Sequence, residues 1–317
     1  MIFEAIIILI AIAAIALLKS RAPPESNGVS NPLRPAKLAD FIGQPEAIKI
    51  IAAMTRHGRL SDHILLVGPP GIGKTTLAYI AAGSAQLHTA IGGQLRTPED
   101  AERAIKLGSD MLFVDEVHAA SRKALEILYS AMEDGVVHLR TGSLQLSPQW
   151  RFLAGTTDSG KLPAHFRDRF GHTIYLNYYP DKDIGKIVRR SAKLLELRLT
   201  SWQVKSFTRR ARGTPRIANT LLRRAADFAS LEGLVKLSDV WEALGIDKDG
   251  LTPLDRQVLQ ILKTADRPIG LEQIARRVGV DTSTIEGSVE PYLLRQGLMD
   301  IQRGGRIAIK EEVKNGT

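Results

Sequence analysis

The chain has 317 residues, which is more than one ordinary hydrophobic core needs and predicts two or three domains. Hydrophobic residues make up 44% and charged residues 24%, values that fit a folded globular protein and exclude a disordered chain. With no cysteine, the chain has no disulfides, thiolate metal sites or cysteine nucleophiles. Aromatic residues reach only 5%, which disfavours stacking platforms for single-stranded nucleic acid.

The formal net charge of +9 is unevenly distributed along the chain. Between Lys161 and Arg224, 16 Lys or Arg residues stand against 4 Asp or Glu residues, a local balance of +12. From Leu251 to the end the counts are 10 and 9. Such a basic middle region either faces the phosphates of a nucleotide or DNA, or forms a solvated helical surface, and charge alone does not distinguish these.

The N-terminus begins with an apolar run from Ala5 to Leu18, and Glu4 is the only interruption in the first 18 residues. Its length is near the lower limit of about 17 residues for a membrane-spanning helix. We predict a membrane anchor at 1–18 and a flexible linker at 19–31, with the rest of the chain on the cytoplasmic side because Lys19 and Arg21 follow the run. A cleaved signal peptide is disfavoured because no basic residue precedes the run. A helix buried against a partner is the alternative.

The segment Ile64 to Val67 is a short apolar run that predicts a buried parallel strand. It leads into GPPGIGKT and then into a helix-like run, which together match the P-loop pattern. Glycines let backbone N–H groups turn toward phosphate oxygens, the lysine carries a positive charge to the β- and γ-phosphates, and the threonine hydroxyl can bind Mg²⁺. We therefore expect ATP and Mg²⁺ as ligands, held by Gly68, Gly71, Gly73, Lys74, Thr75 and Thr76.

A second apolar strand, Met111 to Val114, ends in two carboxylates. We expect Asp115 to bind Mg²⁺, directly or through water, and Glu116 to polarise the water that attacks the γ-phosphate. The pair lies 41 residues after Lys74, which leaves room for an intervening helix and strand in an open α/β sheet. His118 fits a polar loop residue better than a nucleotide sensor.

A third strand, Phe152 to Ala154, ends in Gly155, Thr156 and Thr157. A hydroxyl at the end of a central strand is placed to sense the γ-phosphate between the two motifs above. The sequence does not decide between the two threonines.

The C-terminal region predicts a winged helix. Thr252 is an expected N-cap for the helix in LTPLDRQVLQILKTA, two further helices follow, and MDIQRGGRIAIK alternates like a β-hairpin. We expect Arg303 and Arg306 to contact DNA phosphates from this hairpin, contacts that position a protein without reading bases. A wing used for protein contact is the alternative.

Several motifs together resemble the RuvB family of AAA+ ATPases. GPPGIGKT indicates only an AAA+ protein, and the specific segments are DEVH at Asp115, YSAMED at Tyr129, RDRFG at Arg167, GTPRIAN at Gly213 and EPYLLRQGL at Glu290. The similarity runs from about Arg34 to Ala308. It implies an α/β AAA+ core with a parallel sheet flanked by helices at 32–175, a helical lid at 176–249 and a winged helix at 250–317.

The resemblance also implies roles for single residues. Arg169 matches the arginine finger that enters the ATP site of a neighbouring subunit, with Arg167 as the runner-up, and Arg216 matches the second sensor. Leu33, Arg34 and Tyr179 match the adenine side of the nucleotide. A finger acting in trans requires a homo-oligomeric ring, which is a hexamer in this family. The implied activity is ATP-driven branch migration of Holliday junctions on double-stranded DNA, in recombination and repair.

Two features depart from the family pattern. One is the apolar N-terminus, and the other is the segment between Asp134 and Trp150, which leaves a shorter hairpin than the one that docks RuvA. Coupling to a RuvA-type adaptor is therefore open. Two alternatives remain: a clamp-loader-like ATPase that remodels a protein on DNA, and a membrane-tethered AAA+ ATPase that remodels proteins. An inactive assembly switch is disfavoured because Asp115 and Glu116 are both present.

Overall fold

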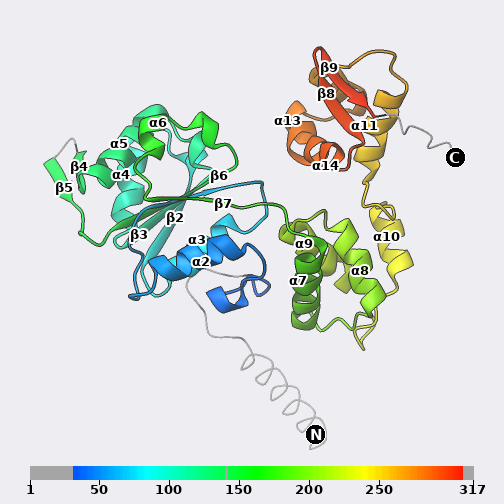
Figure 1. Cartoon of the computed structure of the whole chain (residues 1–317), viewed down its shortest axis with the longest axis horizontal. Coiled ribbons are helices and arrows are strands. Elements are labelled where there is room, and N and C mark those ends of the chain that lie inside the picture. The colour runs from blue at the N-terminus through cyan, green and yellow to red at the C-terminus, as the bar shows by residue number, and fades with distance from the viewer. Residues whose placement is uncertain (1–30, 140–141, 310–317) are drawn as a thin grey trace, which may run out of the picture. The chain divides into compact units, whose positions relative to one another are not determined.

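The computed structural model describes residues 31–139 and 142–309 (Figure 1). The chain divides into two units, 1–34 and 35–317, and the second contains every strand and helix of the described residues. Its first part is built on a five-stranded sheet in which all the neighbouring strands run parallel. The strand order is β2 (Leu87–Ile91), β3 (Met111–Asp115), β6 (Arg151–Thr156), β1 (Ile64–Val67) and β7 (His172–Tyr175).

Helices cover both faces of this sheet, which explains why its central strands are apolar along their whole length. Successive side chains of a strand point to opposite faces. Ile64 and Leu66 of β1 therefore pack on one side with α2 and α3, and Leu65 and Val67 pack on the other side with α4, α5 and α6. The predicted parallel sheet flanked by helices is confirmed. The helices are α2 (Pro45–Met54), α3 (Lys74–Ala82), α4 (Pro98–Leu107), α5 (Arg122–Glu133) and α6 (Ala164–Arg167).

The order of the strands brings the predicted nucleotide motifs to one edge of the sheet. Strand β6 lies between β3 and β1, with Val67 paired to Thr156 and Val114 paired to Ala154. The carboxyl ends of parallel strands meet at one edge, which is where open α/β sheets bind ligands. The P-loop after β1, Asp115 at the end of β3 and Thr156 at the end of β6 are therefore neighbours.

A short antiparallel hairpin connects α5 to the sheet. It consists of β4 (Val136–Leu139) and β5 (Gly142–Gln145), paired from Val136 with Gln145 to Leu139 with Gly142. Its tip, residues 140–141, lies outside the described part of the chain. With four residues in each strand, the hairpin is as short as the sequence suggests.

The second part of the unit is helical. Amphipathic helices α7, α8 and α9 pack through buried Ile184, Val188, Phe207 and Leu222, and α10 follows them. Helix α8 begins with a capping box in which Thr200 and Gln203 satisfy each other's backbone N–H groups. The predicted helical lid is confirmed. Its helices are α7 (Asp181–Leu194), α8 (Ser201–Arg210), α9 (Pro215–Ala226) and α10 (Leu237–Leu244).

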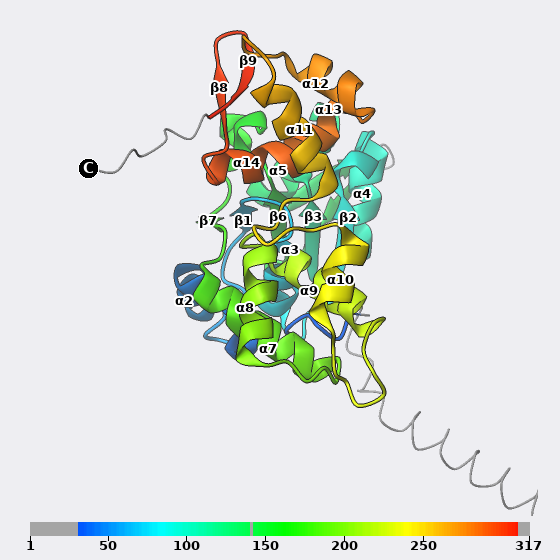
Figure 2. The ribbon, with the colours of Figure 1, turned by 90° about the vertical axis from the view of Figure 1, so that its right-hand side faces the viewer.

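The third part is a winged helix, whose helices and hairpin are labelled in Figure 2. Its own core forms around Val258, Leu262 and Leu293. Thr252 caps the first helix in a capping box with Asp255, as predicted. The hairpin β8–β9 turns at Gly304, whose φ of +106° favours glycine. The elements are α11 (Pro253–Lys263), α12 (Leu271–Val278), α13 (Thr282–Thr284), the π-turn η5 (Ile285–Val289), α14 (Glu290–Arg295), β8 (Met299–Gln302) and β9 (Gly305–Ala308).

The structure does not describe the residues of the predicted membrane anchor. Among the described residues, no helix has the length and apolarity needed to cross a bilayer. The predicted anchor at 1–18, and the predicted linker at 19–31 except for Asn31, lie outside the described residues.

Candidate nucleotide site

The P-loop occupies the turn between β1 and α3. At two of its positions the backbone conformation and the close neighbours require glycine. Gly68 has φ +153°, and a Cβ atom there would lie 2.3 Å from the carbonyl oxygen of Leu176. Gly71 has φ +79°, and a Cβ atom there would lie 2.8 Å from Cβ of Arg216. Helix α3 begins directly after Gly73, so its N-terminal partial positive charge points at the loop. Thr76 lies half-buried in the first turn of that helix.

Lys74 is the cation inside this loop. Its side chain is only 5% exposed, and its Nζ donates to the carbonyl oxygens of Gly68 at 2.7 Å and Pro69 at 3.1 Å. The Glu116 carboxylate lies 3.7 Å from the same nitrogen. Burial lowers the pKa of Lys74, the charges of Glu116 and Asp115 oppose this, and the charge of Arg216 adds to it. A bound triphosphate would replace the loop carbonyls with anionic partners for this ammonium group.

Asp115 and Thr75 form the place where a magnesium ion fits. The Thr75 hydroxyl donates to Oδ2 of Asp115 at 2.7 Å. Two ligands on adjacent corners of an Mg²⁺ octahedron, each about 2.0–2.1 Å from the ion, are separated by a similar distance. One hydroxyl and one carboxylate are also the kind of protein ligand set that Mg²⁺ uses when phosphate oxygens and water supply the rest.

Glu116, which lies beside the P-loop, is held by Thr157 at the end of the neighbouring strand β6. Its backbone has φ +50°, an uncommon conformation for a residue other than glycine. Its Oε2 accepts hydrogen bonds from the backbone N–H of Thr157 at 3.1 Å and from the Thr157 hydroxyl at 2.9 Å. The carboxylate is about one third exposed, so a water molecule can reach it.

The two threonines at the end of β6 have different surroundings. Thr156 is fully buried, and its hydroxyl lies 2.9 Å from Nδ1 of His118 and accepts from the backbone N–H of Asp158 at 3.1 Å. Thr157 is exposed and bonds to Glu116. The Thr157 hydroxyl therefore contacts the Glu116 carboxylate directly, whereas Thr156 is linked to it through His118, whose Nδ1 lies 3.4 Å from Oε2 of Glu116.

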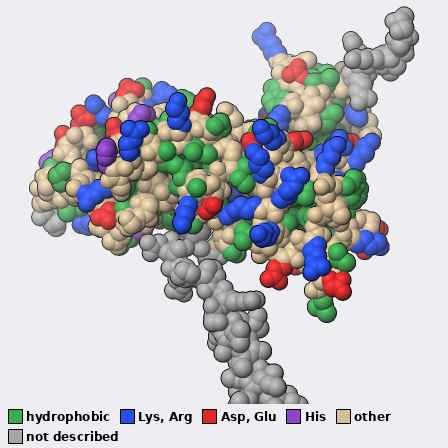
Figure 3. Space-filling view, turned by 60° about the horizontal axis from the view of Figure 1, so that its bottom comes forward, with side chains coloured by type: hydrophobic (Ala, Val, Ile, Leu, Met, Phe, Trp, Pro, Cys, Tyr) green, Lys and Arg blue, Asp and Glu red, His purple; other side chains and the backbone are tan. Residues whose placement is uncertain are grey.

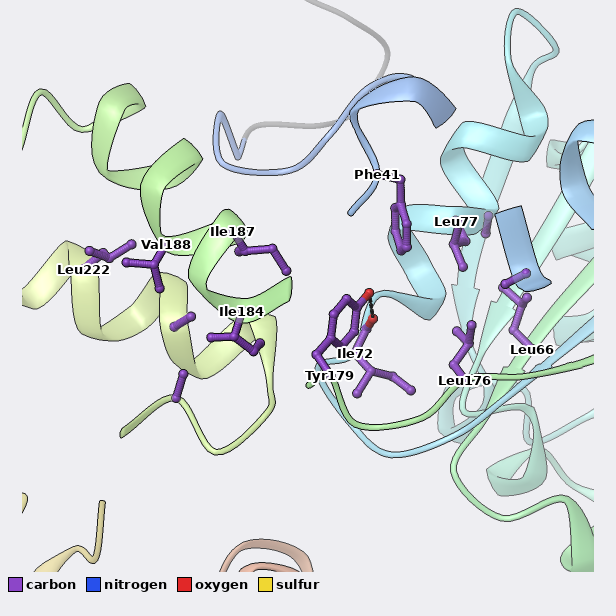
Figure 4. Packing of buried hydrophobic residues seen from close by; sticks show 14 of the residues in the cluster. Phe41, Leu66, Ile72, Leu77, Leu176, Tyr179, Ile184, Ile187, Val188 and Leu222 are labelled. Carbon is purple, nitrogen blue, oxygen red and sulfur yellow. Dashed lines mark hydrogen bonds between the residues drawn. The ribbon is translucent and has the colours of Figure 1, made fainter. Parts of the chain in front are cut away.

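Tyr179 packs against the P-loop, on the side where the sequence predicts adenine (Figure 4). Its hydroxyl donates to the carbonyl oxygen of Ile72 at 2.9 Å, and burial raises its pKa. Its ring also leaves no room for a Cβ atom at Gly43, where the distance would be 2.6 Å. Leu33 is 2% exposed and Arg34 is half-buried, and both belong to the other unit of the chain.

Arg216 lies at the start of α9, close to the P-loop. Its backbone N–H donates to the carbonyl oxygen of Gly71 at 3.2 Å. Its side chain is exposed, and its charge acts on the pKa of Lys74. Pro215 at the first helical position fixes this approach, since proline is favoured where no N–H is needed.

Arg169 is held by residues other than those of the P-loop of its own chain. Its Nε lies 2.6 Å from Oε2 of Glu133, and its Nη2 donates to the hydroxyl of Tyr129 at 2.9 Å. The hydrogen bond to Tyr129 raises the pKa of Arg169, desolvation opposes this, and the charge of Glu133 adds to the increase. The side chain is 39% exposed. Arg167, by contrast, is half-buried, and its Nε is buried without a hydrogen-bond partner in the described part of the chain, so Arg169 is the more exposed of the two arginines.

The two arginines predicted to contact DNA from the wing have different surroundings. Arg303 is exposed beside the hairpin turn. Arg306, expected at the wing surface, instead donates from Nε to Oε1 of Glu290 at 2.6 Å and from Nη2 to Oε2 at 3.3 Å, and its side chain is only 17% exposed. The alternation of the hairpin does not reveal this partner, because Glu290 lies 16 residues earlier on α14.

Sequence reasoning assigns no role to Tyr129 and Glu133, although both lie in the YSAMED segment. The two residues are four apart on α5, so they share one face of that helix. That spacing is the available signal for a common partner. Most Lys and Arg residues of the basic middle region lie on or between α7, α8 and α9, and Figure 3 shows several Lys and Arg side chains gathered on the face that it draws.

A P-loop beside a strand-end Asp-Glu pair, in a parallel sheet followed by a helical lid and a winged helix, defines an AAA+ ATPase. Family models match nearly all of the described residues: the Holliday junction DNA helicase RuvB P-loop domain at 33–176, the RuvB AAA lid domain at 179–246 and the RuvB C-terminal winged helix domain at 248–314. The chain belongs to the RuvB family.

Individual relatives agree with this. The Holliday junction branch migration complex subunit RuvB of Pseudarthrobacter chlorophenolicus is 40% identical over 309 residues, covering 90% of this chain and 85% of that protein. The subunit from Kosmotoga olearia is 38% identical, with 89% of each chain covered. The solved RuvB Holliday junction branch migration motor of Thermotoga maritima is 33% identical, with a TM-score of 0.78 over 89% of this chain and 97% of that one. These matches do not favour the clamp-loader-like and protein-remodelling alternatives.

Proposed function

We propose that this chain is an ATP-driven DNA motor that promotes branch migration of Holliday junctions in recombination and repair. One observation carries the proposal: all three RuvB domain models match in order, over a chain whose P-loop, strand-end carboxylates and strand-end hydroxyl meet at one sheet edge. The names of the relatives supply the reaction, and the geometry supplies a site able to hydrolyse ATP.

The chemistry at this site is attack of water on the γ-phosphorus of ATP, releasing ADP and inorganic phosphate. Glu116 orients the water and accepts its proton, and Lys74 stabilises charge on the β- and γ-phosphate oxygens. Thr75 and Asp115 would hold Mg²⁺, which when bound would neutralise further charge on the phosphates. The Thr157 hydroxyl, which donates to Glu116 in this structure, can donate instead to a γ-phosphate oxygen and thereby free the carboxylate.

A neighbouring subunit completes the site. Arg169 is exposed and held away from the P-loop of its own chain, as expected of a cation that acts in trans on the charge of the transferring phosphoryl group. We infer a homo-oligomeric ring, hexameric as in the family resemblance. Arg216 beside Gly71 links the lid to the nucleotide state, so that cycles of hydrolysis change the lid angle and draw double-stranded DNA through the ring.

The DNA contact on the winged helix is assigned to Arg303, whose exposed guanidinium at the hairpin turn can reach a phosphate. The protein acts where ATP and DNA are present, on the cytoplasmic side. The membrane anchor at 1–18 stays a prediction from the sequence. The short β4–β5 hairpin keeps a RuvA-type adaptor an open question for experiment.

The test is branch migration of a synthetic four-way junction by the full chain, with and without a RuvA-type adaptor. We expect ATP-dependent conversion of the junction to duplex products, abolished by Lys74→Ala and by Arg169→Ala. Hydrolysis of ATP with no junction conversion in any condition would overturn the branch-migration proposal and leave the ATPase assignment standing.

A further inference from the structure

The exposed side chain of Arg169 is held by two residues of its own subunit, Tyr129 and Glu133. Nε of Arg169 lies between Oε2 of Glu133 at 2.6 Å and the Tyr129 hydroxyl at 3.2 Å, and Nη2 donates to that hydroxyl at 2.9 Å. The guanidinium also lies over the Tyr129 ring, 5.2 Å from its centre. Two residues of one helix therefore contact both the charge and the plane of the arginine.

The support is itself rigid. Helix α5 is capped by Ser121, which accepts from the backbone N–H of Ala124, and it is anchored in the core by buried Leu125 and Leu128. The ring of Tyr129 meets the ring of His165 edge-on, with centroids 5.6 Å apart. The Tyr129 ring is thus held by His165 on α6, and Glu133 is placed by the backbone of the same anchored helix α5.

The contacts occupy the inner side of the guanidinium and leave its outer end available. Within the described part of the chain, Nη1 of Arg169 makes no hydrogen bond, and Nη2 uses one of its two hydrogens for Tyr129. An arginine binds a phosphate through a fork of two N–H groups. The support therefore leaves donors for a phosphate oxygen while restraining the direction in which they point.

We propose that Tyr129 and Glu133 are positioning residues for the trans-acting arginine finger. They hold the guanidinium of Arg169 toward the ATP of the neighbouring subunit, so that it is oriented before the subunits meet. This rests on the proposed trans role of Arg169. A half-exposed ion pair adds little to the stability of a fold. Misplacing a catalytic group by about 1 Å, however, can cost about a hundredfold in rate.

The expected effect is on turnover and not on ATP affinity. Glu133→Gln keeps the side-chain shape and removes the charge that restrains Nε, and we expect kcat for ATP hydrolysis to fall about tenfold at an unchanged KM. Tyr129→Phe keeps the ring and removes the hydroxyl, and it should lower kcat in the same way. Glu126→Gln is the matched control, since Glu126 lies on the same helix and, within the described residues, has its ion pair with exposed Arg122, at 3.9 Å.

A subunit-mixing experiment places the effect on the finger donor. Glu116→Gln subunits keep the finger but lack the base, and Arg169→Ala subunits keep the base but lack the finger. We expect each to be inactive alone and the mixture to hydrolyse ATP. Adding Glu133→Gln to the Glu116→Gln subunit should remove most of the restored activity, whereas adding Glu126→Gln should not.

The outcomes separate the two proposals. A mixture that restores no activity would overturn the trans role of Arg169, and this inference with it. Restored activity that Glu133→Gln and Tyr129→Phe in the donor leave unchanged would overturn the inference alone. Equal melting temperatures for Glu133→Gln and Glu126→Gln, together with loss of activity only in the former, would support a positioning role over a structural one.

Discussion

The two arginines of the wing should behave differently when each is replaced by alanine. Arg306→Ala leaves Glu290 as a carboxylate that is only 8% exposed and has lost both of its guanidinium bonds. Breaking a buried ion pair costs about 3–5 kcal/mol. Because Arg306 keeps 17% of its side chain exposed, we expect a value near 3 kcal/mol in the free energy of unfolding of the winged helix.

Amide hydrogen exchange on the full chain measures this quantity locally. A loss of about 3 kcal/mol corresponds to roughly a hundredfold faster exchange of the most protected amides in α11 and α14, at about 1.4 kcal/mol per factor of ten. Arg303→Ala removes only an exposed side chain and should leave the exchange unchanged. Its effect should be on DNA, where the loss of one phosphate contact lowers the slope of log affinity against log salt by about one unit.

One result for Arg306→Ala and Arg303→Ala would refute this reasoning. If Arg306→Ala leaves the exchange rates of the winged helix unaltered and weakens DNA binding as much as Arg303→Ala does, Arg306 is a surface phosphate ligand and the ion pair with Glu290 is not its main partner. Restoration of slow exchange by Glu290→Gln in the Arg306→Ala background would instead support the pair.

Three further predictions concern the nucleotide site and the N-terminus. Thr157→Val removes the hydroxyl that donates to Glu116, so ATP hydrolysis should fall at least tenfold while ATP still binds. Turnover and titration with a fluorescent nucleotide measure these two effects. Turnover equal to that of the wild type would contradict the sensor assignment. Gly71→Ala places a Cβ atom 2.8 Å from Arg216 at a φ of +79°, so nucleotide affinity should drop in the same titration, and wild-type affinity would show that the loop is not constrained there. Removal of residues 1–30 should release the protein from lipid vesicles in a flotation assay, and a full chain that never floats would contradict the predicted anchor at 1–18.

Much of the nucleotide site was predictable because it depends on local sequence. The P-loop and Asp115-Glu116 each follow an apolar strand, and a parallel sheet brings strand ends together whatever the intervening loops are. The choice between Thr156 and Thr157 required the structure. Thr157 bonds to Glu116 and Thr156 bonds to His118, and both contacts depend on how the strand ends are brought together in the fold.

What could not be predicted depends on contacts between distant residues. Glu290 binds Arg306 across 16 residues, and Tyr129 bonds to Arg169 across 40. The spacing of Tyr129 and Glu133 on one helix face can suggest that they share a partner, but the sequence does not show that this partner is Arg169. The π-helical turn at Ile285–Val289 could be predicted only in part. Pro291 supplies no backbone N–H, and its ring crowds the carbonyl one turn earlier. These effects favour a widened turn but do not specify one.

The concentration dependence of ATP hydrolysis is the most direct test that each active site is shared between two subunits. Turnover per subunit, measured on the full chain alongside its sedimentation, should be low for monomers and rise over the same concentrations at which rings form. Monomers that hydrolyse ATP as fast as the assembled protein would contradict the account, because every catalytic group would then have to come from one chain.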